Sequence, residues 1–452
     1  MALAENDAPT AIPEAELAEV QADLTAANGA AGADVPADVL AQTLGQYLRA
    51  SWQRIRSGDS GILPVLLGLV LVAIVFEVIT PENAYLRPSN LIYIFGLSTV
   101  YMVLAMAETV VLLLGEIDLS IGAVALMGGA IAFKLVQQPK PNLPWWLAIL
   151  ISLASCGLIG TLQGTLVSRL KIPSFVVTLG GYLLFTGILI IILGGADGFV
   201  SVSSTVPNQA VIFNLVQGDV DQTVSWVALA VLLVIAGVVM WLRNSARRRS
   251  GLVAPPASLV AIRIVLLAVV GVVVVFVCSQ TFTPGVPEVI TIVLAILLLW
   301  TMGLQRTRFG RYIYAIGGNP EAARRAGVNL ALVRTAAFAL CSVTAGFGGI
   351  LLGSFFFGQY STNTADPGQI VLYAVAAAVI GGTSLFGGRG KAIHGVLGGL
   401  LIGGIAYGVS LLQLGQLSTP LTYILPGAVL LLAVLVDVLS RRGARTGSVS
   451  RV

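Results

Sequence analysis

Residues 312–334 read YIYAIGGNPEAARRAGVNLALVR, a polar and charged stretch between two long apolar runs. Those runs are too hydrophobic to be anything other than membrane spans, so the stretch is expected to form a surface on the cytosolic side of the bilayer. Asn319 is suited to cap a helix start, Pro320 to stand at its first position and Glu321 to complement the positive end of its dipole. Gly327 is suited to end it. The pattern predicts a helix of about two turns.

This helix, expected over 319–327, would carry Arg324 and Arg325. It is too short to be stable alone in water, so it needs a partner surface. One interpretation is a connector that lies on the bilayer with its arginines on lipid phosphates. The other is a coupling helix that inserts into an ATPase. The residues alone leave both interpretations open.

The composition indicates a polytopic α-helical membrane protein. Hydrophobic residues make up 57% of the chain and charged residues 10%, and the mean hydropathy is +0.93. A soluble globular protein has about a quarter charged residues. The net charge of +4 does not indicate nucleic acid as a partner, because the basic residues fall in short loops between apolar runs. No metal site is expected, since the cysteines lack CxxC spacing and the single histidine has no companion: Cys156, Cys278, Cys341 and His394.

Twelve apolar runs approach the length of about 20 residues that a membrane helix needs. They are 62–80, 91–114, 117–136, 145–167, 173–194, 224–242, 259–281, 288–304, 334–357, 369–385, 393–412 and 420–439.

Loop charges predict that both termini are cytoplasmic. Basic residues gather in the even-numbered connections from the fourth onward and in the tail, as the positive-inside bias requires. Outside loops carry mainly acidic residues. The basic set is Arg169, Lys171, Arg243, Arg247, Arg248, Arg249, Arg306 to Arg334, Arg389, Lys391, Arg441, Arg442 and Arg445, and the acidic set is Glu82, Asp197, Asp219, Asp221 and Asp366.

Three regions are expected along the chain. Residues 1–60 are rich in Ala, Glu, Asp and Pro and predict a cytosolic, partly disordered extension. Within it, 38–56 has the spacing of an amphipathic helix. Residues 61–440 form the transmembrane domain, and 441–452 a cytosolic tail.

Spans two to five and spans nine to twelve predict an inverted repeat. In both sets an acidic, polar turn follows the first span, at 115–120 and at 359–366. In both sets a proline, Pro173 or Pro420, begins the last span. Inverted repeats place a substrate route near the bilayer midplane, between the two halves.

The first of these turns, GEIDLSIGA at 115–123, places Glu116 and Asp118 between two apolar runs. Ionised carboxylates at such a place must be capped, paired or hydrated. One interpretation is structural, with Asp118 as the N-cap of the third span and Glu116 in a tight turn. The other is a broken helix that borders the translocation route, together with Ser120.

The glycine-rich stretch IGGTSLFGGRGK at 380–391 does not match a phosphate-binding loop. That pattern needs glycine where Leu385 stands and Ser or Thr where Ala392 stands. A tight cytosolic turn between two spans is the simpler interpretation. The chain is therefore not expected to be an enzyme or to bind a cofactor itself, and an ion gradient or a separate subunit must supply energy.

Several of these motifs resemble one family. GGNPEAARRAGVN at 317–329 resembles the cytoplasmic coupling segment of permease subunits of ABC-type monosaccharide importers, which include the ribose, arabinose, galactose and xylose permeases. GEIDLS is similar to the GGIDLS signature of that family, with Glu116 in place of the second glycine, as in xylose-type members. The start IPSF at 172–175 followed by TLGG at 178–181 is also shared. The resemblance covers nearly all of 91–437.

This resemblance implies a permease subunit in a bacterial inner membrane that passes a monosaccharide, a pentose such as xylose, into the cytoplasm. The implied partners are an ABC ATPase that uses ATP and Mg, a periplasmic sugar-binding protein, a second permease copy and membrane lipid. The implied coupling residues are Asn319, Pro320, Glu321, Ala322, Arg324, Arg325 and Gly327.

A route for sugar needs amides, hydroxyls and aromatic rings. Besides the signature residues Glu116, Asp118 and Ser120, the candidates are Gln163, Thr178, Phe355 and Tyr360, followed by Tyr182, Gln359, Tyr407 and Gln413. Each of these is also a residue type that commonly makes helix contacts.

Two other functions stay open. An ion-coupled secondary transporter of a small polar solute would need buried carboxylates, for which Glu108, Glu116 and Asp118 are the main options. A branched-chain amino acid ABC permease would share the ATPase arrangement and differ in substrate.

Overall fold

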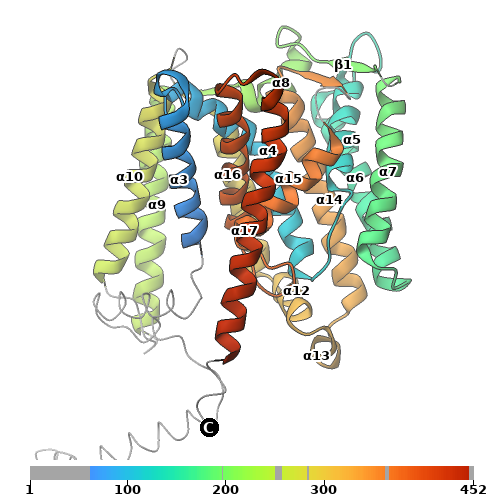
Figure 1. Cartoon of the computed structure of the whole chain (residues 1–452), viewed down its shortest axis with the longest axis vertical. Helices are drawn as coiled ribbons and strands as arrows, with labels where there is room; N and C mark the ends of the chain where they lie inside the picture. Colours follow the sequence, from blue (N-terminus) through green and yellow to red (C-terminus); the bar gives the residue numbers. More distant parts are fainter. Residues whose placement is uncertain (1–61, 196, 250–256, 282–284, 362–365, 447–452) are drawn as a thin grey trace, which may run out of the picture. The chain divides into compact units, whose positions relative to one another are not determined.

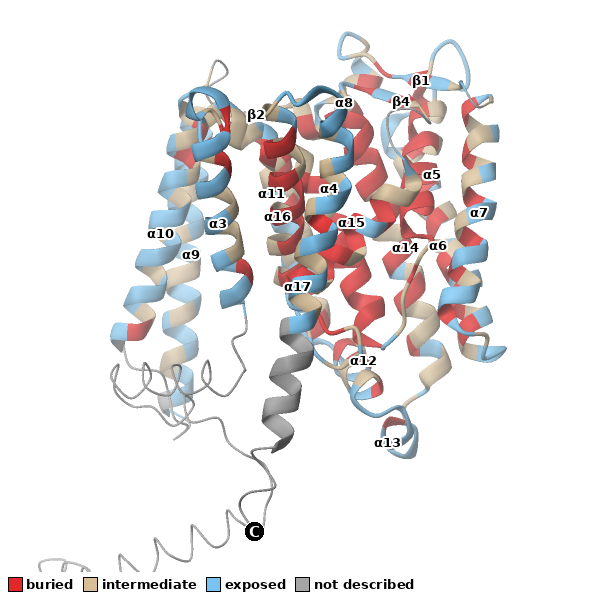
Figure 2. Cartoon of the chain, in the orientation of Figure 1, coloured by how far each residue is buried: buried red, intermediate tan, exposed pale blue. Residues whose placement is uncertain are grey.

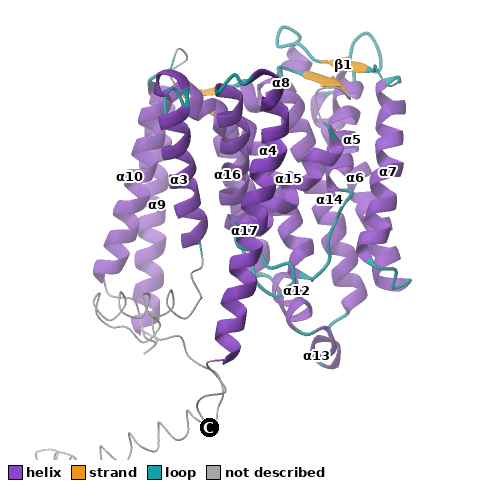
Figure 3. Ribbon diagram, in the orientation of Figure 1, coloured by secondary structure: helices purple, strands orange, loops and turns teal. Residues whose placement is uncertain are grey.

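The computed structural model describes residues 62–195, 197–249, 257–281, 285–361 and 366–446 (Figure 1). The predictions for the N-terminal extension and for the last residues of the tail lie outside these ranges. Helix dominates the described chain (Figure 3). The long helices are α3 (Leu63–Ile79), α4 (Pro88–Leu113), α5 (Ile121–Val136), α6 (Trp145–Arg169), α7 (Ser174–Leu193), α9 (Gln222–Arg249), α10 (Ala257–Ser279), α11 (Glu288–Arg306), α14 (Leu330–Phe355), α15 (Pro367–Ile380), α16 (Ala392–Leu411) and α17 (Ser418–Thr446).

Each of the twelve predicted spans coincides with one of these helices, so the predicted α-helical membrane fold is confirmed. Nine are long and apolar enough to cross a membrane, and α3, α5 and α15 are shorter apolar helices. The number of crossings and the side of each terminus stay predictions. Helix α17 continues to Thr446, so the first residues of the predicted tail are helical.

The shorter elements were not predicted, apart from α13 (Pro320–Arg325). They are α8 (Pro207–Gln217), α12 (Arg308–Gly318), the one-turn helices η1 (Pro81–Asn83) and η2 (Gly415–Leu417), and four three-residue strands. Strand β1 (Phe199–Ser201) pairs antiparallel with β4 (Gln359–Ser361), and β2 (Asp219–Asp221) with β3 (Gly285–Pro287). Three-residue strands in turns carry no long period-2 pattern that a sequence could show.

The described chain falls into two compact units. One contains residues 235–266, which are the end of α9 and the beginning of α10, and the other contains the remaining described residues. In the first unit, a Cβ added at Gly237 would lie 3.8 Å from Ile264 Cδ1, which is an ordinary helix contact. The second unit holds all the residues discussed below.

Helix α4 is the centre of the second unit. Almost all of its hydrophobic span is buried, and it packs against α14, α15 and α16 (Figure 2). By contrast, most residues in the hydrophobic spans of α6, α7, α11 and α17 are exposed or only partly buried. A helix that is apolar all round and buried lies in the protein core, whereas exposed apolar faces are suited to lipid.

The helix contacts agree with the predicted inverted repeat. Most packed pairs have a counterpart when α4, α5, α6 and α7 are exchanged with α14, α15, α16 and α17. For example, α4 with α16 matches α14 with α6, and α5 with α7 matches α15 with α17. Helices α4 and α14 are antiparallel, because Gly96 lies beside Phe355 while Gly348 lies beside Leu104. The two halves are therefore related by a pseudo-two-fold axis that crosses the helices.

The short helices α5 and α15 start deep inside the bundle. Gly122, in the first turn of α5, faces the carbonyl of Pro367, which begins α15, and an added Cβ would lie 2.4 Å from that oxygen. Helix α5 ends at Val136, whose carbonyl accepts from the Gln209 side chain of α8. At 1.5 Å per residue, the point where α5 and α15 start lies about 20 Å from the Val136 end of α5. Helix α14 is about 39 Å long on the same basis, so this point lies roughly halfway along the bundle. Asp366, predicted to lie in an outside loop, instead stands at this meeting point.

Glycines allow the closest helix contacts in both halves. On α6, a Cβ at Gly160 would lie 2.3 Å from Phe338 O, and on α16 a Cβ at Gly399 would lie 2.4 Å from Met102 N. Small residues at such positions let membrane helices approach to backbone contact. Of the two neighbouring glycines of α7, Gly181 allows a close approach, against Gln163. Gly180 does not, because no described atom lies within 4 Å of an added Cβ there.

We expect Gly399→Ala to lower the thermal midpoint of the purified protein, because its new methyl group has no room against α4. Overpacking of this kind costs about 1–3 kcal/mol. The matched control is Gly187→Ala on α7, where an added Cβ meets no described atom within 4 Å. Thermal unfolding in detergent measures both, and equal midpoints for the two variants would contradict the close-approach explanation.

Candidate functional site

Helix α13 has the local geometry predicted for it. The Ala322 N–H donates to Asn319 Oδ1 at 3.0 Å, and Gly327 adopts a left-handed φ of 84° that closes the helix. Glu321 accepts from Arg324 at 2.8 Å and lies 3.4 Å from Arg325. The hydrogen bond from Arg324 lowers the pKa of the exposed Glu321 carboxyl. Only Ala323 is buried, so α13 presents an ionised, polar surface.

The amphipathic helix α12 attaches α13 to the core. Its buried face carries Ile313 and Ile316, and the Tyr314 hydroxyl donates to Gly390 O at 2.7 Å. In the same glycine-rich turn, Gly388 N donates to the carbonyl of Leu113 at 2.9 Å, at the end of α4. Sequence reasoning missed α12, although hydrophobic residues at 309, 313 and 316 have helical spacing. The coupling stretch, the glycine-rich turn and the central helix therefore meet in one place.

The signature turn at 115–120 is held by a buried polar network. The Asp118 N–H donates to Glu108 Oε1 at 3.1 Å. Asp118 Oδ1 accepts from both the N–H and the hydroxyl of Ser120, at 2.9 and 2.6 Å. The amide of Gln163 on α6 lies 2.9 Å from the Ser120 hydroxyl. All four side chains are buried, so the three predicted residues Asp118, Ser120 and Gln163 are brought together.

Helix α7 contacts the same turn. The Thr178 hydroxyl lies 3.3 Å from the carbonyl of Ile117 and donates to its own helix at Ser174 O, at 2.9 Å. The Ile117 N–H points to Ser174 Oγ at 3.4 Å. The IPSF and TLGG stretch therefore holds the turn, in addition to packing helices.

The interpretation of Asp118 as the N-cap of the third span is wrong. Ser120 occupies the N-cap position of α5 without a side-chain cap bond, and Asp118 binds Ser120 instead. Glu116 does lie in the turn, and it forms an ion pair with Arg334 of α14 at 3.4 Å. The non-helical segment 114–120 between α4 and α5 matches the alternative interpretation, a broken helix.

The remaining pathway candidates are spread over the bundle. Phe355 and Tyr360 are buried against Tyr93 and Phe133, with ring centroids 5.1 and 5.6 Å apart. Tyr407 donates to Asn90 Oδ1 at 2.8 Å. These contacts show packing, and a role of these residues in a route stays a prediction, as it does for the exposed Gln359 and Gln413.

Two polar groups lie at the point where α5 and α15 start. Asp366 is exposed, and its carboxylate accepts from the N–H groups of Gly368 and Gln369 at 2.9 and 3.2 Å. The half-buried Tyr182 of α7 points its hydroxyl there, 3.1 Å from where a Cβ on Gly368 would lie. An exposed carboxylate at mid-bundle depth indicates a hydrated surface.

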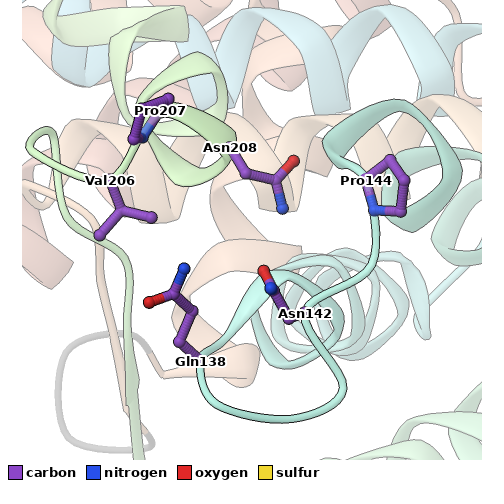
Figure 4. Close-up of a pocket in the computed structure, with 6 residues that line it drawn as sticks. All are labelled: Gln138, Asn142, Pro144, Val206, Pro207 and Asn208. Atoms are coloured by element: carbon purple, nitrogen blue, oxygen red, sulfur yellow. The ribbon is translucent and has the colours of Figure 1, made fainter.

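A hollow opens at the end of the unit opposite α13. Figure 4 shows the amides of Gln138, Asn142 and Asn208 around it, and the remaining lining residues are Pro144, Val206 and Pro207. Asn208 is already engaged, because it accepts from Trp145 N at 2.8 Å and donates to Leu143 O at 2.7 Å. The hollow is thus a polar surface feature between α8 and the start of α6.

A polytopic membrane bundle with repeated halves, two deep helix breaks and a charged peripheral helix is typical of transport proteins. Residues 90–434 match the family described as "Branched-chain amino acid transport system / permease component", which shows that the chain belongs to this permease family.

Curated relatives carry sugar transport names. The chain is 32% identical over 380 residues to the xylose transport system permease protein XylH of Escherichia coli (strain K12), covering 84% of this chain and 92% of that protein. It is 28% identical to the ribose import permease protein RbsC of the same strain, over 82% of this chain and 91% of that protein. It is 26% identical to the fructose import permease protein FrcC of Rhizobium meliloti, over 94% and 95%. No solved structure matches. The resemblance to sugar permeases is therefore confirmed.

Glu108 was considered only as an ion-coupling carboxylate, and the structure makes it part of the signature turn. It is fully buried, and its second oxygen, Oε2, has no hydrogen-bond partner within the described residues. An acidic residue inside an apolar run was the available signal. Glu108 meets Asp118 because the chain turns back toward α4 after that helix ends. The sequence does not specify this direction.

We expect Ser120→Ala to destabilise the purified protein, because Asp118 loses a hydroxyl donor and Gln163 loses its partner. Leaving such buried groups unpaired costs about 1–3 kcal/mol. Thermal unfolding in detergent would show a lower midpoint. The control is Ser155→Ala on α6, where the hydroxyl only donates to its own helix at Ile151 O, and an unchanged midpoint for Ser120→Ala would contradict the network.

Proposed function

We propose that this protein is the membrane-spanning permease subunit of an ATP-driven importer of a monosaccharide, a pentose such as xylose. The observation that carries the proposal is α13, a capped, ionised helix that exposes almost all its residues at one end of the bundle. A six-residue helix with a single buried side chain gains little from its own chain, which suits it to dock on a partner. The relatives named for xylose, ribose and fructose transport support the sugar as cargo.

The proposed partner at α13 is an ABC ATPase, which would bind and hydrolyse ATP with Mg. The opposite end, including the amide-lined hollow at Asn142 and Asn208, would receive a periplasmic sugar-binding protein. The apolar faces of α6, α7 and α17 would contact lipid or a second permease copy in a bacterial inner membrane. The basic loops near α13 agree with a cytosolic position for that end.

The proposed route passes the point where α5 and α15 start. There Asp366 is exposed, and the Tyr182 hydroxyl has no hydrogen-bond partner in the described chain. A carboxylate and a phenol hydroxyl offer an acceptor and a donor to sugar hydroxyls. Broken helices of inverted repeats place substrate contacts at this depth.

One observation favours a second candidate, an ion-coupled transporter. Glu108 and Asp118 are fully buried side by side, and neither has a basic partner among the described ion pairs. Labelled xylose uptake into cells tests both candidates: ATP depletion stops uptake by an ABC importer, whereas an uncoupler stops uptake by a proton-coupled transporter.

We expect Glu321→Lys, or a double substitution of Arg324 and Arg325, to abolish uptake while the protein stays in the membrane, because the charge pattern offered to the ATPase is altered. Uptake of labelled sugar is compared with the amount of membrane-inserted protein. The matched control is Glu82→Lys, which reverses an exposed acid paired with Arg87 far from α13. Normal uptake by inserted Glu321→Lys protein would count against the coupling role.

We expect Tyr182→Phe to lower the maximal uptake rate about threefold to tenfold, the effect of one lost hydrogen bond. Asp366→Asn is expected to act in the same direction while keeping a good helix cap. Transport by the complex in vesicles, with saturating binding protein, measures both. Tyr423→Phe, an exposed tyrosine of α17, is the control, and wild-type rates for both variants would exclude this contact point.

A further inference from the structure

The signature turn is held from two sides by contacts of different kinds. On its inner side, the Asp118 N–H donates to Glu108 of α4, and both residues are fully buried. On its outer side, Glu116 pairs with Arg334, in the first turns of α14. The contact between Asp118 and Glu108 joins the turn to the buried core. The contact between Glu116 and Arg334 joins the turn to the helix that follows α13.

Arg334 is close to α13 along a short and ordered chain. Helix α13 ends at Arg325, and Asn329 caps α14 by accepting from the Leu332 N–H at 3.0 Å. Helices α13 and α14 also contact each other directly. The first turns of α14, where Arg334 stands, are therefore directly connected to α13.

The Glu116–Arg334 pair differs from the other described ion pairs. Its side chains are 16% and 23% exposed, whereas those of Glu321 with Arg324 and of Glu82 with Arg87 are at least half exposed. Exposed pairs are screened by water and contribute little. The 3.4 Å contact nevertheless lacks hydrogen-bond geometry, because Arg334 Nε is buried without a hydrogen-bond partner. The pair is thus an electrostatic contact without a directional hydrogen bond at Arg334 Nε.

We propose that Glu116 and Arg334 are positioning residues that couple the movement of α13 to the signature turn at 115–120. A shift of α14 relative to α4 changes the distance between the two charges, and the turn follows because Glu116 is part of it. The turn carries Asp118 and Ser120 next to the start of α5, and α5 starts against α15. The pair therefore links the ATPase-facing end to the depth at which the helix breaks meet. This inference rests on the proposed function.

The test uses the complete complex, with ATPase and binding protein, in vesicles. Uptake of labelled xylose and ATP hydrolysis are measured together for Glu116→Gln, Arg334→Gln, the double variant and the exchanged pair Glu116→Arg with Arg334→Glu. We expect each single variant to lower the uptake per ATP hydrolysed about tenfold, within the range of coupling effects. The double neutral variant is expected to be no worse than either single one, and the exchanged pair to recover at least half of the wild-type ratio.

A merely structural pair gives a different result. It would lower the thermal midpoint and the amount of inserted protein, with an unchanged ratio of uptake to hydrolysis. That result, or additive losses in the double variant, would overturn the inference. The control is Arg87→Gln, which breaks the exposed pair with Glu82 at 3.0 Å and is expected to leave the ratio within twofold. If the wild-type complex shows no ATP-driven uptake of any tested sugar, the proposed function fails. If the wild-type complex transports sugar and the variants keep the wild-type ratio of uptake to ATP hydrolysis, the inference on Glu116 and Arg334 fails.

Discussion

Backbone that leaves the helical conformation inside a membrane protein must find hydrogen-bond partners within the protein, because lipid offers none. The turn between α4 and α5 shows how this chain meets that requirement. Glu108 accepts from the Asp118 N–H, Asp118 from the Ser120 N–H, and Thr178 donates toward the Ile117 carbonyl. These side chains come from α4, α7 and the turn itself, so the helix break and the packing of three elements depend on one another.

Close approach of helices makes these contacts possible. Without side chains at Gly160 and Gly399, α6 and α16 reach the backbones of α14 and α4. The pseudo-two-fold arrangement applies the same packing in both halves, which leaves α5 and α15 to start against each other at mid-depth. The two helix breaks therefore lie where the two halves of the bundle pack against each other.

At the α13 end the same core is joined to a polar surface. Helix α12 buries Ile313 and Ile316 and exposes its other face, and the glycine-rich turn binds the end of α4 through Gly388. These contacts attach α12 and the glycine-rich turn to the end of the central helix. The exposed residues of α13 are held by their own cap and ion pairs, so they are available to a partner without rearrangement.

The sequence by itself determined the elements whose signals are local. Twelve apolar runs predicted twelve helices, because burial in lipid or core requires continuous hydrophobicity, and Asn319, Pro320 and Gly327 predicted the limits of α13, because capping depends on neighbouring residues. Tertiary structure decided which polar residues meet. The fold brings Glu108 to Asp118 and Glu116 to Arg334, and it places both Asp366 and Tyr182 beside Gly368. These positions depend on how distant segments pack and on the direction in which the chain returns after α4. Gly180 and Gly181 follow one another on α7, so their side-chain positions point about 100° apart. Only the location of α6 decides that Gly181 is in contact, with Gln163, and Gly180 is not.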